Sequence, residues 1–261
     1  PGGIIGINLG MFLNTKREGE LASVMCHELA HLSQRHFARS QNRSSPLANA
    51  LMILGSIAVA AASRNPEAIM IAPAAMQQMS INYTRSNEKE ADRIGFNNLV
   101  KAGFDPNDMT MMFQRMQDKY QREDSEQFSY LMTHPLPSER LTDMRIRADN
   151  IKSPSEGLFR DNLDFYFMQK RSEIWAEKNT KELIKKYKKD FESDQINVSL
   201  SSRYGLALAL KKEKNYEESF KILRELIKEN PNNLVLESSL MEIHLSAKNY
   251  YEAISLGKNI L

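Results

Sequence analysis

The segment that most constrains the fold is residues 24–32, VMCHELAHL, where two histidines stand four positions apart in an apolar-periodic run. On an α-helix, residues four apart lie about 40° apart around the axis and one turn along it. His27 and His31 can therefore direct both imidazoles at one metal ion, with Glu28 beside them. The pattern predicts a helix over about residues 18–39 that bears two ligands and the general base of a zinc peptidase.

A catalytic zinc commonly has three protein ligands and one open position, so a third ligand must come from elsewhere in the chain. A second helix is expected over about residues 80–102. On that helix Glu88, Ala91, Asp92 and Gly95 share one face, which is acidic at one end and small elsewhere. This face can pack closely against the motif helix, so that Glu88 reaches the metal and Asp92 accepts the outer N–H of a ligand histidine.

Other residues near these motifs are expected to stay off the metal. Glu90 points about 200° away from Glu88, and His36 lies about 140° round the helix from His31, as a surface or packing residue. The alternative for the acidic face is a solvated surface, charge-paired with Arg85, Lys89 and Arg93.

Composition narrows the function classes. Hydrophobic residues make up 41% and charged residues 26% of the 261, a soluble globular balance. The net charge of +2 is small, which argues against nucleic-acid binding. The single cysteine, Cys26, excludes an intrachain disulfide.

An apolar stretch at 47–62 separates the two ligand helices and leads into a Met-rich segment through Met79. It is shorter than the roughly 20 residues needed to span a bilayer. We interpret it either as a buried or partner-covered helix or as a peripheral membrane contact. The whole region 41–80 is either a mobile cover over the cleft or part of the core.

The C-terminal part contains a repeat. Lys214-Asn215-Tyr216 recurs as Lys248-Asn249-Tyr250, 34 residues later, and Ser219 aligns with Ala253. A two-helix unit of this period is typical of tetratricopeptide repeats, with a generic helical bundle as the alternative. We expect a metallopeptidase domain at 1–152, N-terminally incomplete, a linker at 153–160, and about three repeats at 161–261, C-terminally incomplete. A short strand is expected at 4–9, as a sheet edge to which an extended peptide could add.

Taken together, these motifs resemble the gluzincin zinc metallopeptidases that include HtpX and the CaaX prenyl proteases. His27-Glu28-x-x-His31 is followed by Glu88-x-x-Ala91-Asp92 and then by Thr133-His134-Pro135 with Glu139-Arg140. The C-terminal repeats make the chain similar to the soluble periplasmic BepA-type branch of Gram-negative bacteria. The resemblance implies a mainly α fold: a helical zinc-binding domain with a small sheet edge, followed by the helical repeat domain.

The resemblance also implies substrates and partners. It points to a periplasmic zinc endopeptidase that cleaves unfolded or misassembled outer-membrane proteins and works beside the outer-membrane β-barrel assembly machinery. The membrane-spanning helices of HtpX and the prenyl proteases are absent from the sequence, which argues against prenyl-peptide substrates. The alternative function is a chaperone or assembly factor whose peptidase activity is restrained.

His134 and Arg140 enter through the same resemblance. His134 stands in a proline-containing loop that we expect near Glu88, and it has two possible active roles. It either stabilises the oxyanion of the tetrahedral intermediate or occupies the open zinc position as a fourth ligand in a closed state. Arg140 either holds this loop or contacts substrate, and a surface role is the alternative.

Overall fold

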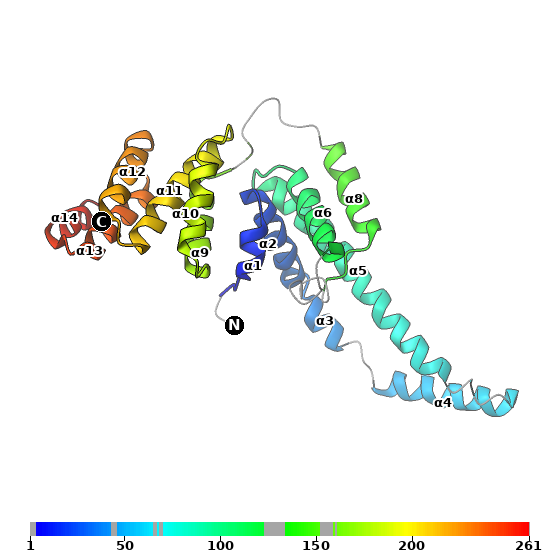
Figure 1. Ribbon diagram of the computed structural model, residues 1–261. Coiled ribbons are helices and arrows are strands. Elements are labelled where there is room, and N and C mark those ends of the chain that lie inside the picture. Colours follow the sequence, from blue (N-terminus) through cyan, green and yellow to red (C-terminus); the bar gives the residue numbers. More distant parts are fainter. Residues whose placement is uncertain are drawn as a thin grey trace. The chain divides into compact units, whose positions relative to one another are not determined.

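The computed structural model describes residues 4–42, 46–64, 67, 70–122, 134–151, 159 and 161–260, which are mainly helical. The chain forms two compact units: Gly19–Arg160, and Asp161–Leu261 together with Pro1–Glu18. The expected linker at 153–160 falls almost wholly outside the described residues. Each unit has its own arrangement of helices (Figure 1).

The first unit contains both sequence motifs. Its helices are α2 (Glu18–Ser33), α3 (His36–Asn42), α4 (Pro46–Ser63), α5 (Ile71–Lys101), α6 (Asn107–Arg122) and α8 (Ser138–Asn150). Helix α5 ends before Gly103, whose φ of +86° is a left-handed conformation that glycine adopts without strain. The predicted end of this helix near residue 102 is confirmed, whereas α5 begins about nine residues before the expected start at 80, because the Met-rich segment continues into it.

The motif helix is shorter than predicted. A continuous helix to about residue 39 is wrong, because α2 ends at Ser33 and Arg35 takes a φ of +53° before α3 begins at His36. A left-handed residue turns the chain, so residues beyond it no longer follow the angular positions of α2. This break changes the position of His36.

Helices α2 and α5 approach each other closely where the motifs meet. Ala91 is fully buried, and a Cβ built on Gly95 would lie 3.0 Å from the Cα and the N of His27. Only a residue without a side chain allows this separation of the two backbones. The small face predicted on α5 therefore contacts the motif helix directly.

Helix α4 lies at an angle to α5 and contacts it near the N-terminal end of α5 (Figure 1). Its apolar side chains are largely exposed, including Leu51, Leu54 and Val59 at 60%, 62% and 51%. The interpretation of 47–62 as a buried helix is therefore wrong for most side chains described there, although Ser56 and Ala60 are buried, and the partner-covered alternative stays a prediction. Among the residues described, no helix is long and apolar enough to cross a membrane.

The second unit joins the N-terminal segment to the repeat helices. Gln169 donates hydrogen bonds to the Phe12 and Thr15 carbonyl oxygens, at 2.7 and 2.8 Å, and Phe12 packs edge-on against Phe165. By their contacts, residues up to 18 group with the helices of 161–261, while the expected metallopeptidase boundaries of 1–152 stay a prediction.

The strand expected at 4–9 is not observed. Residues 4–8 have no regular structure, Asn8 caps α1 (Leu9–Asn14), and no strand occurs anywhere in the described ranges. A strand needs a hydrogen-bonded neighbouring strand, and the residues from Leu9 onward belong to α1 instead.

The remaining helices are α9 (Leu163–Ala176), α10 (Thr180–Asp190), α11 (Ile196–Lys212), α12 (Tyr216–Glu229), α13 (Leu234–Ser246) and α14 (Tyr250–Ile260). The 34-residue repeat is visible in the backbone, since Lys214 and Lys248 have φ values of +65° and +64°. Asn215 and Asn249 donate equivalent N–H bonds of 2.9 Å to Leu210 and His244.

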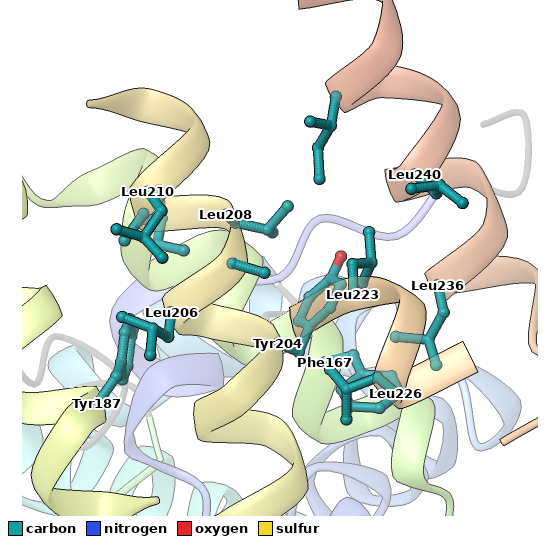
Figure 2. Packing of buried hydrophobic residues seen from close by; sticks show 14 of the residues in the cluster. Phe167, Tyr187, Tyr204, Leu206, Leu208, Leu210, Leu223, Leu226, Leu236 and Leu240 are labelled. Carbon is teal, nitrogen blue, oxygen red and sulfur yellow. The ribbon is translucent and has the colours of Figure 1, made fainter. Parts of the chain in front are cut away.

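One apolar cluster holds the repeat helices together. Figure 2 shows Tyr204 and Phe167 near Leu223, Leu226 and Leu236, side chains contributed by four helices, and all five are fully buried. Contacts between successive helices dominate this unit, which is the arrangement that stacked repeats require.

Candidate metal centre

Four side chains from three segments converge in the first unit. His27 and His31 come from α2, Glu88 from α5, and His134 from the loop before α8. One ligand atom from each lies within 4.8 Å of all the others. The Nε2 atoms of His27 and His31 are 3.0 Å apart, and those two atoms lie 3.4 and 3.2 Å from the Glu88 carboxylate oxygens.

The outer nitrogen of His27 is fixed by α5 and α8. Its Nδ1 lies 3.0 Å from Asp92 Oδ1, in line with the outer N–H acceptor expected of that residue. Arg140 holds Asp92 from the other side through two hydrogen bonds, from Nε at 2.6 Å and from Nη2 at 2.7 Å. Its Nη1 lies 2.8 Å from Glu88 Oε2, so one guanidinium orients both acids.

The outer nitrogen of His31 contacts His36, a residue that the sequence had not placed near the centre. His36 Nδ1 lies 2.8 Å from His31 Nδ1, and His36 Nε2 lies 3.1 Å from Glu90 Oε2. His36 is only 4% exposed, so of the two expected roles, surface or packing, its burial fits packing, whereas its contact with His31 was not expected. The helix break at Arg35 is the reason, and no signal in the α2 periodicity could have indicated it.

His134 lies beside the acids that face the metal position. Its Nδ1 is 3.1 Å from Glu88 Oε1, and its Nε2 is 3.6 Å from Glu28 Oε1. Glu28 is the most open of these groups, with 42% of its side chain exposed. Thr133, the first residue of the predicted loop motif, lies outside the described residues.

Burial and charge pairing set the electrostatics of the centre without metal. Burial disfavours the charged form of His27, but hydrogen bonds to Asp92 and Glu88 outweigh this and raise its pKa to about 9. Burial works against ionising Glu88 and Asp92 too, yet their histidine and arginine partners hold both pKa values below the usual range. Burial lowers the pKa of His36.

The donor set fits a divalent cation such as zinc. Two imidazoles and one carboxylate are a common catalytic zinc set, and His134 adds a possible fourth donor. The Nε2 atoms of His27 and His31 lie near each other and near the carboxylate, while their outer nitrogens lie 3.0 Å from Asp92 and 2.8 Å from His36. A cation between them would satisfy this arrangement. Glu88 and Asp92 are buried, at 3% and 1% exposure, so the alternative of a solvated acidic face does not describe them.

A cleft of about 660 Å³ opens beside Glu88 and Arg140. Its apolar walls come from Ile81 on α5 and from Leu136 and Pro137 in the His134 loop. Arg85 and Lys89 line the same cleft, and the exposed Lys89 lies 3.1 Å from Glu139. The cleft is thus bounded by the elements that supply Glu88 and His134.

A His-His-Glu set, with His27 and Glu88 buried and His31 half-buried, and a partly exposed glutamate next to it define a centre of the metallopeptidase type. Comparison with known proteins agrees, because residues 1–148 match the model of peptidase family M48. The chain belongs to this family.

Curated relatives are similar over nearly the whole chain. A putative beta-barrel assembly-enhancing protease from Vibrio cholerae is 39% identical over 238 residues, 89% of this chain and 48% of the relative. The beta-barrel assembly-enhancing proteases of Yersinia pestis and Escherichia coli K12 are 36% and 34% identical, over 100% and 99% of this chain and 54% and 53% of theirs. The chain therefore spans about half the length of these relatives.

Proposed function

We propose that the chain is the catalytic part of a zinc-dependent endopeptidase, with His27, His31 and Glu88 as metal ligands. The observation that supports this most directly is the convergence of their donor atoms within 4.8 Å, together with His134, beside the partly exposed Glu28. Asp92 orients His27 through its outer nitrogen, and Arg140 orients Asp92 and Glu88.

A zinc ion held by these ligands would supply Lewis acidity toward the scissile carbonyl and the attacking water. Glu28 takes the proton from that water and delivers it to the leaving amine. Its exposure leaves it accessible to a substrate, whereas Glu88 and Asp92 are enclosed. The cleft lined by Ile81 and Leu136 receives the peptide chain next to these groups.

The substrates we propose are unfolded or misassembled outer-membrane proteins in the periplasm of a Gram-negative bacterium. The printed names of the relatives, which concern β-barrel assembly, support this assignment. The helices of 161–261 act as tetratricopeptide repeats that recruit substrate or the outer-membrane assembly machinery, which the shared backbone conformations at Lys214 and Lys248 support.

Glu28→Gln tests the mechanism. The amide keeps the size of the side chain but cannot accept a proton, so zinc content by atomic emission should equal that of the wild type while cleavage of casein and of an unfolded outer-membrane protein is abolished. Cleavage by Glu28→Gln at the wild-type rate would refute the role of Glu28. A wild-type protein that binds no zinc would refute the metal site itself.

A second candidate function is that of an assembly factor whose peptidase activity is restrained. The contact between His134 and Glu88 favours it. His134 belongs to the donor cluster and lies 3.1 Å from Glu88, where it can serve as a fourth ligand and exclude water. His134→Ala should raise activity if the imidazole closes the site and lower it if the imidazole stabilises the oxyanion. A Glu28→Gln variant that retains assembly function in cells would favour this second function over proteolysis.

We also propose that α4 makes a peripheral membrane contact, supported by exposed apolar side chains such as Leu54 and Ile57 on a helix without charged residues. Leu54→Glu should reduce co-sedimentation with vesicles of phosphatidylethanolamine and phosphatidylglycerol by several-fold. Equal recovery of both proteins in the vesicle pellet would leave a protein partner or a cover over the cleft as the role of α4.

A further inference from the structure

A continuous set of hydrogen-bond contacts leads away from the metal position on the His31 side. It runs from His31 Nδ1 to His36 Nδ1 at 2.8 Å, and from His36 Nε2 to Glu90 Oε2 at 3.1 Å. Arg39 Nη2 donates to the same Glu90 oxygen at 2.9 Å. We call His31, His36 and Glu90 the hydrogen-bond relay.

The geometry dictates which nitrogen holds each proton when His31 ligates through Nε2. The proton of a neutral His31 must then be on Nδ1, and that N–H donates to His36 Nδ1. His36 consequently holds its own proton on Nε2 and donates it to Glu90. In this arrangement His31 donates to His36 and His36 donates to Glu90. Every imidazole nitrogen of the relay then has a partner.

On the His27 side, the outer nitrogen also leads to an acid and an arginine, but through one residue fewer. There the outer nitrogen faces a carboxylate directly, Asp92, and Arg140 holds that carboxylate. On the His31 side an imidazole is inserted between the ligand and its carboxylate–arginine pair. The outer nitrogen of each of the two histidines is thus connected, directly or through His36, to an acid that an arginine contacts.

We propose that His36 and Glu90 are positioning residues that fix the tautomer and the ring orientation of His31 for metal binding. This inference rests on the proposed zinc site and extends it to residues on α3 and on the outer face of α5. The turn at Arg35 is what makes it possible, because on an unbroken helix His36 would lie about 140° away from His31. Loss of such an orienting partner typically costs 10–100-fold in metal affinity.

Two substitutions at His36 separate positioning from packing. His36→Asn places an amide oxygen close to the position of Nδ1, so it retains an acceptor for His31 but leaves space unfilled. His36→Phe fills the ring volume but offers no acceptor. Zinc affinity is measured by competition with a chromophoric chelator, and the unfolding temperature of the metal-free protein is measured in parallel. Asp143→Asn, which alters an exposed pair with Arg147 on α8, is the control.

The relay predicts opposite rank orders in the two measurements. His36→Phe should lose about 10–100-fold in zinc affinity and His36→Asn clearly less, while His36→Phe should be the more stable of the two without metal. In the zinc-loaded wild type the His31 Nδ1–H proton should be visible by NMR and protected from exchange, and in His36→Phe it should exchange rapidly. The control should match the wild type in zinc affinity.

Each contrary result has a distinct meaning. If His36→Phe binds zinc at least as well as His36→Asn, and the wild type binds and cleaves normally, the relay is refuted while the proposed function stands. If the wild type binds no zinc, the proposed function fails, and the relay fails with it as a metal-positioning device.

Discussion

Gly95→Ala should damage the centre from the face of α5 that contacts α2, although Gly95 itself is not one of the donor residues. The added Cβ would meet the Cα and the N of His27 at 3.0 Å and the backbone carbon of Cys26 at 3.1 Å. These are backbone atoms of the motif helix, which cannot rotate away as a side chain would. The two helices must therefore separate by a few tenths of an ångström at the point where Asp92 meets His27.

The magnitude follows from two opposed effects. Alanine in place of a helical glycine gains about 0.5–1 kcal/mol of stability, and overpacking costs about 1–3 kcal/mol. Gly55→Ala on α4 supplies a control for the first effect, because a Cβ there would meet nothing within 4 Å. Subtracting the control leaves a deficit of about 1–3 kcal/mol for Gly95→Ala, or roughly 2–12 °C in unfolding temperature.

Calorimetry of the wild type and both variants measures this gap in the transition that zinc shifts, because that transition reports the unit containing the site. Zinc affinity of Gly95→Ala should fall on the order of tenfold, since the ligands of α5 move away from those of α2. A Gly95→Ala protein as stable and as tightly zinc-binding as Gly55→Ala would show that the helix approach does not position the centre.

Three further predictions concern Arg140, Gln169 and His27. Arg140→Lys should lower zinc affinity about 10–100-fold by chelator competition, because an ammonium cannot contact Asp92, Glu88 and the Pro135 carbonyl together; unchanged affinity would contradict this. Gln169→Ala removes the amide bonds to Phe12 and Thr15 and should cost about 1–3 kcal/mol, seen as faster proteolysis within the first 18 residues. His27 has its pKa raised to about 9, so its contribution in chelator-treated protein is full below pH about 6.5 and lost as pH rises through about 9. The unfolding temperature should fall over that window, and a His27→Asn variant without the same fall confirms the source.

The sequence predicted best those parts of the centre that depend on local helix geometry. The four-residue spacing of His27 and His31 and the face shared by Glu88, Ala91 and Asp92 are periodic features of single helices. These are the side chains that the structure brings together, with Asp92 on the outer nitrogen of His27. The repeat was readable for a similar reason, because the same turn recurs 34 residues later, at 214 and at 248.

What the sequence did not predict depends on turns and on packing between distant segments. His36 was misplaced because one residue, Arg35, adopts a positive φ, and an arginine gives no warning of that conformation. The strand expected at 4–9 was inferred from β-branched composition, which describes a residue's fit to a sheet rather than the presence of one. The exposure of Leu51 and Leu54 was likewise not predictable, because the sequence of an apolar helix does not tell whether other elements cover it.

The position of Arg140 bears on how His134 could act. Its guanidinium donates to the Pro135 carbonyl at 2.6 Å while holding Asp92, so the backbone next to His134 is tied to α5 independently of any metal. Arg140 is itself buried and lies over the ring of Phe113, 5.3 Å from its centroid, which fixes it further. A change in the role of His134 would then need only rotation of its side chain away from the donor cluster, with the loop backbone at Pro135 in place. Such a rotation has to break the 3.1 Å contact with Glu88 and the edge-on ring contacts with His27 and His31, so a peptide in the adjoining cleft must supply that free energy to open the centre.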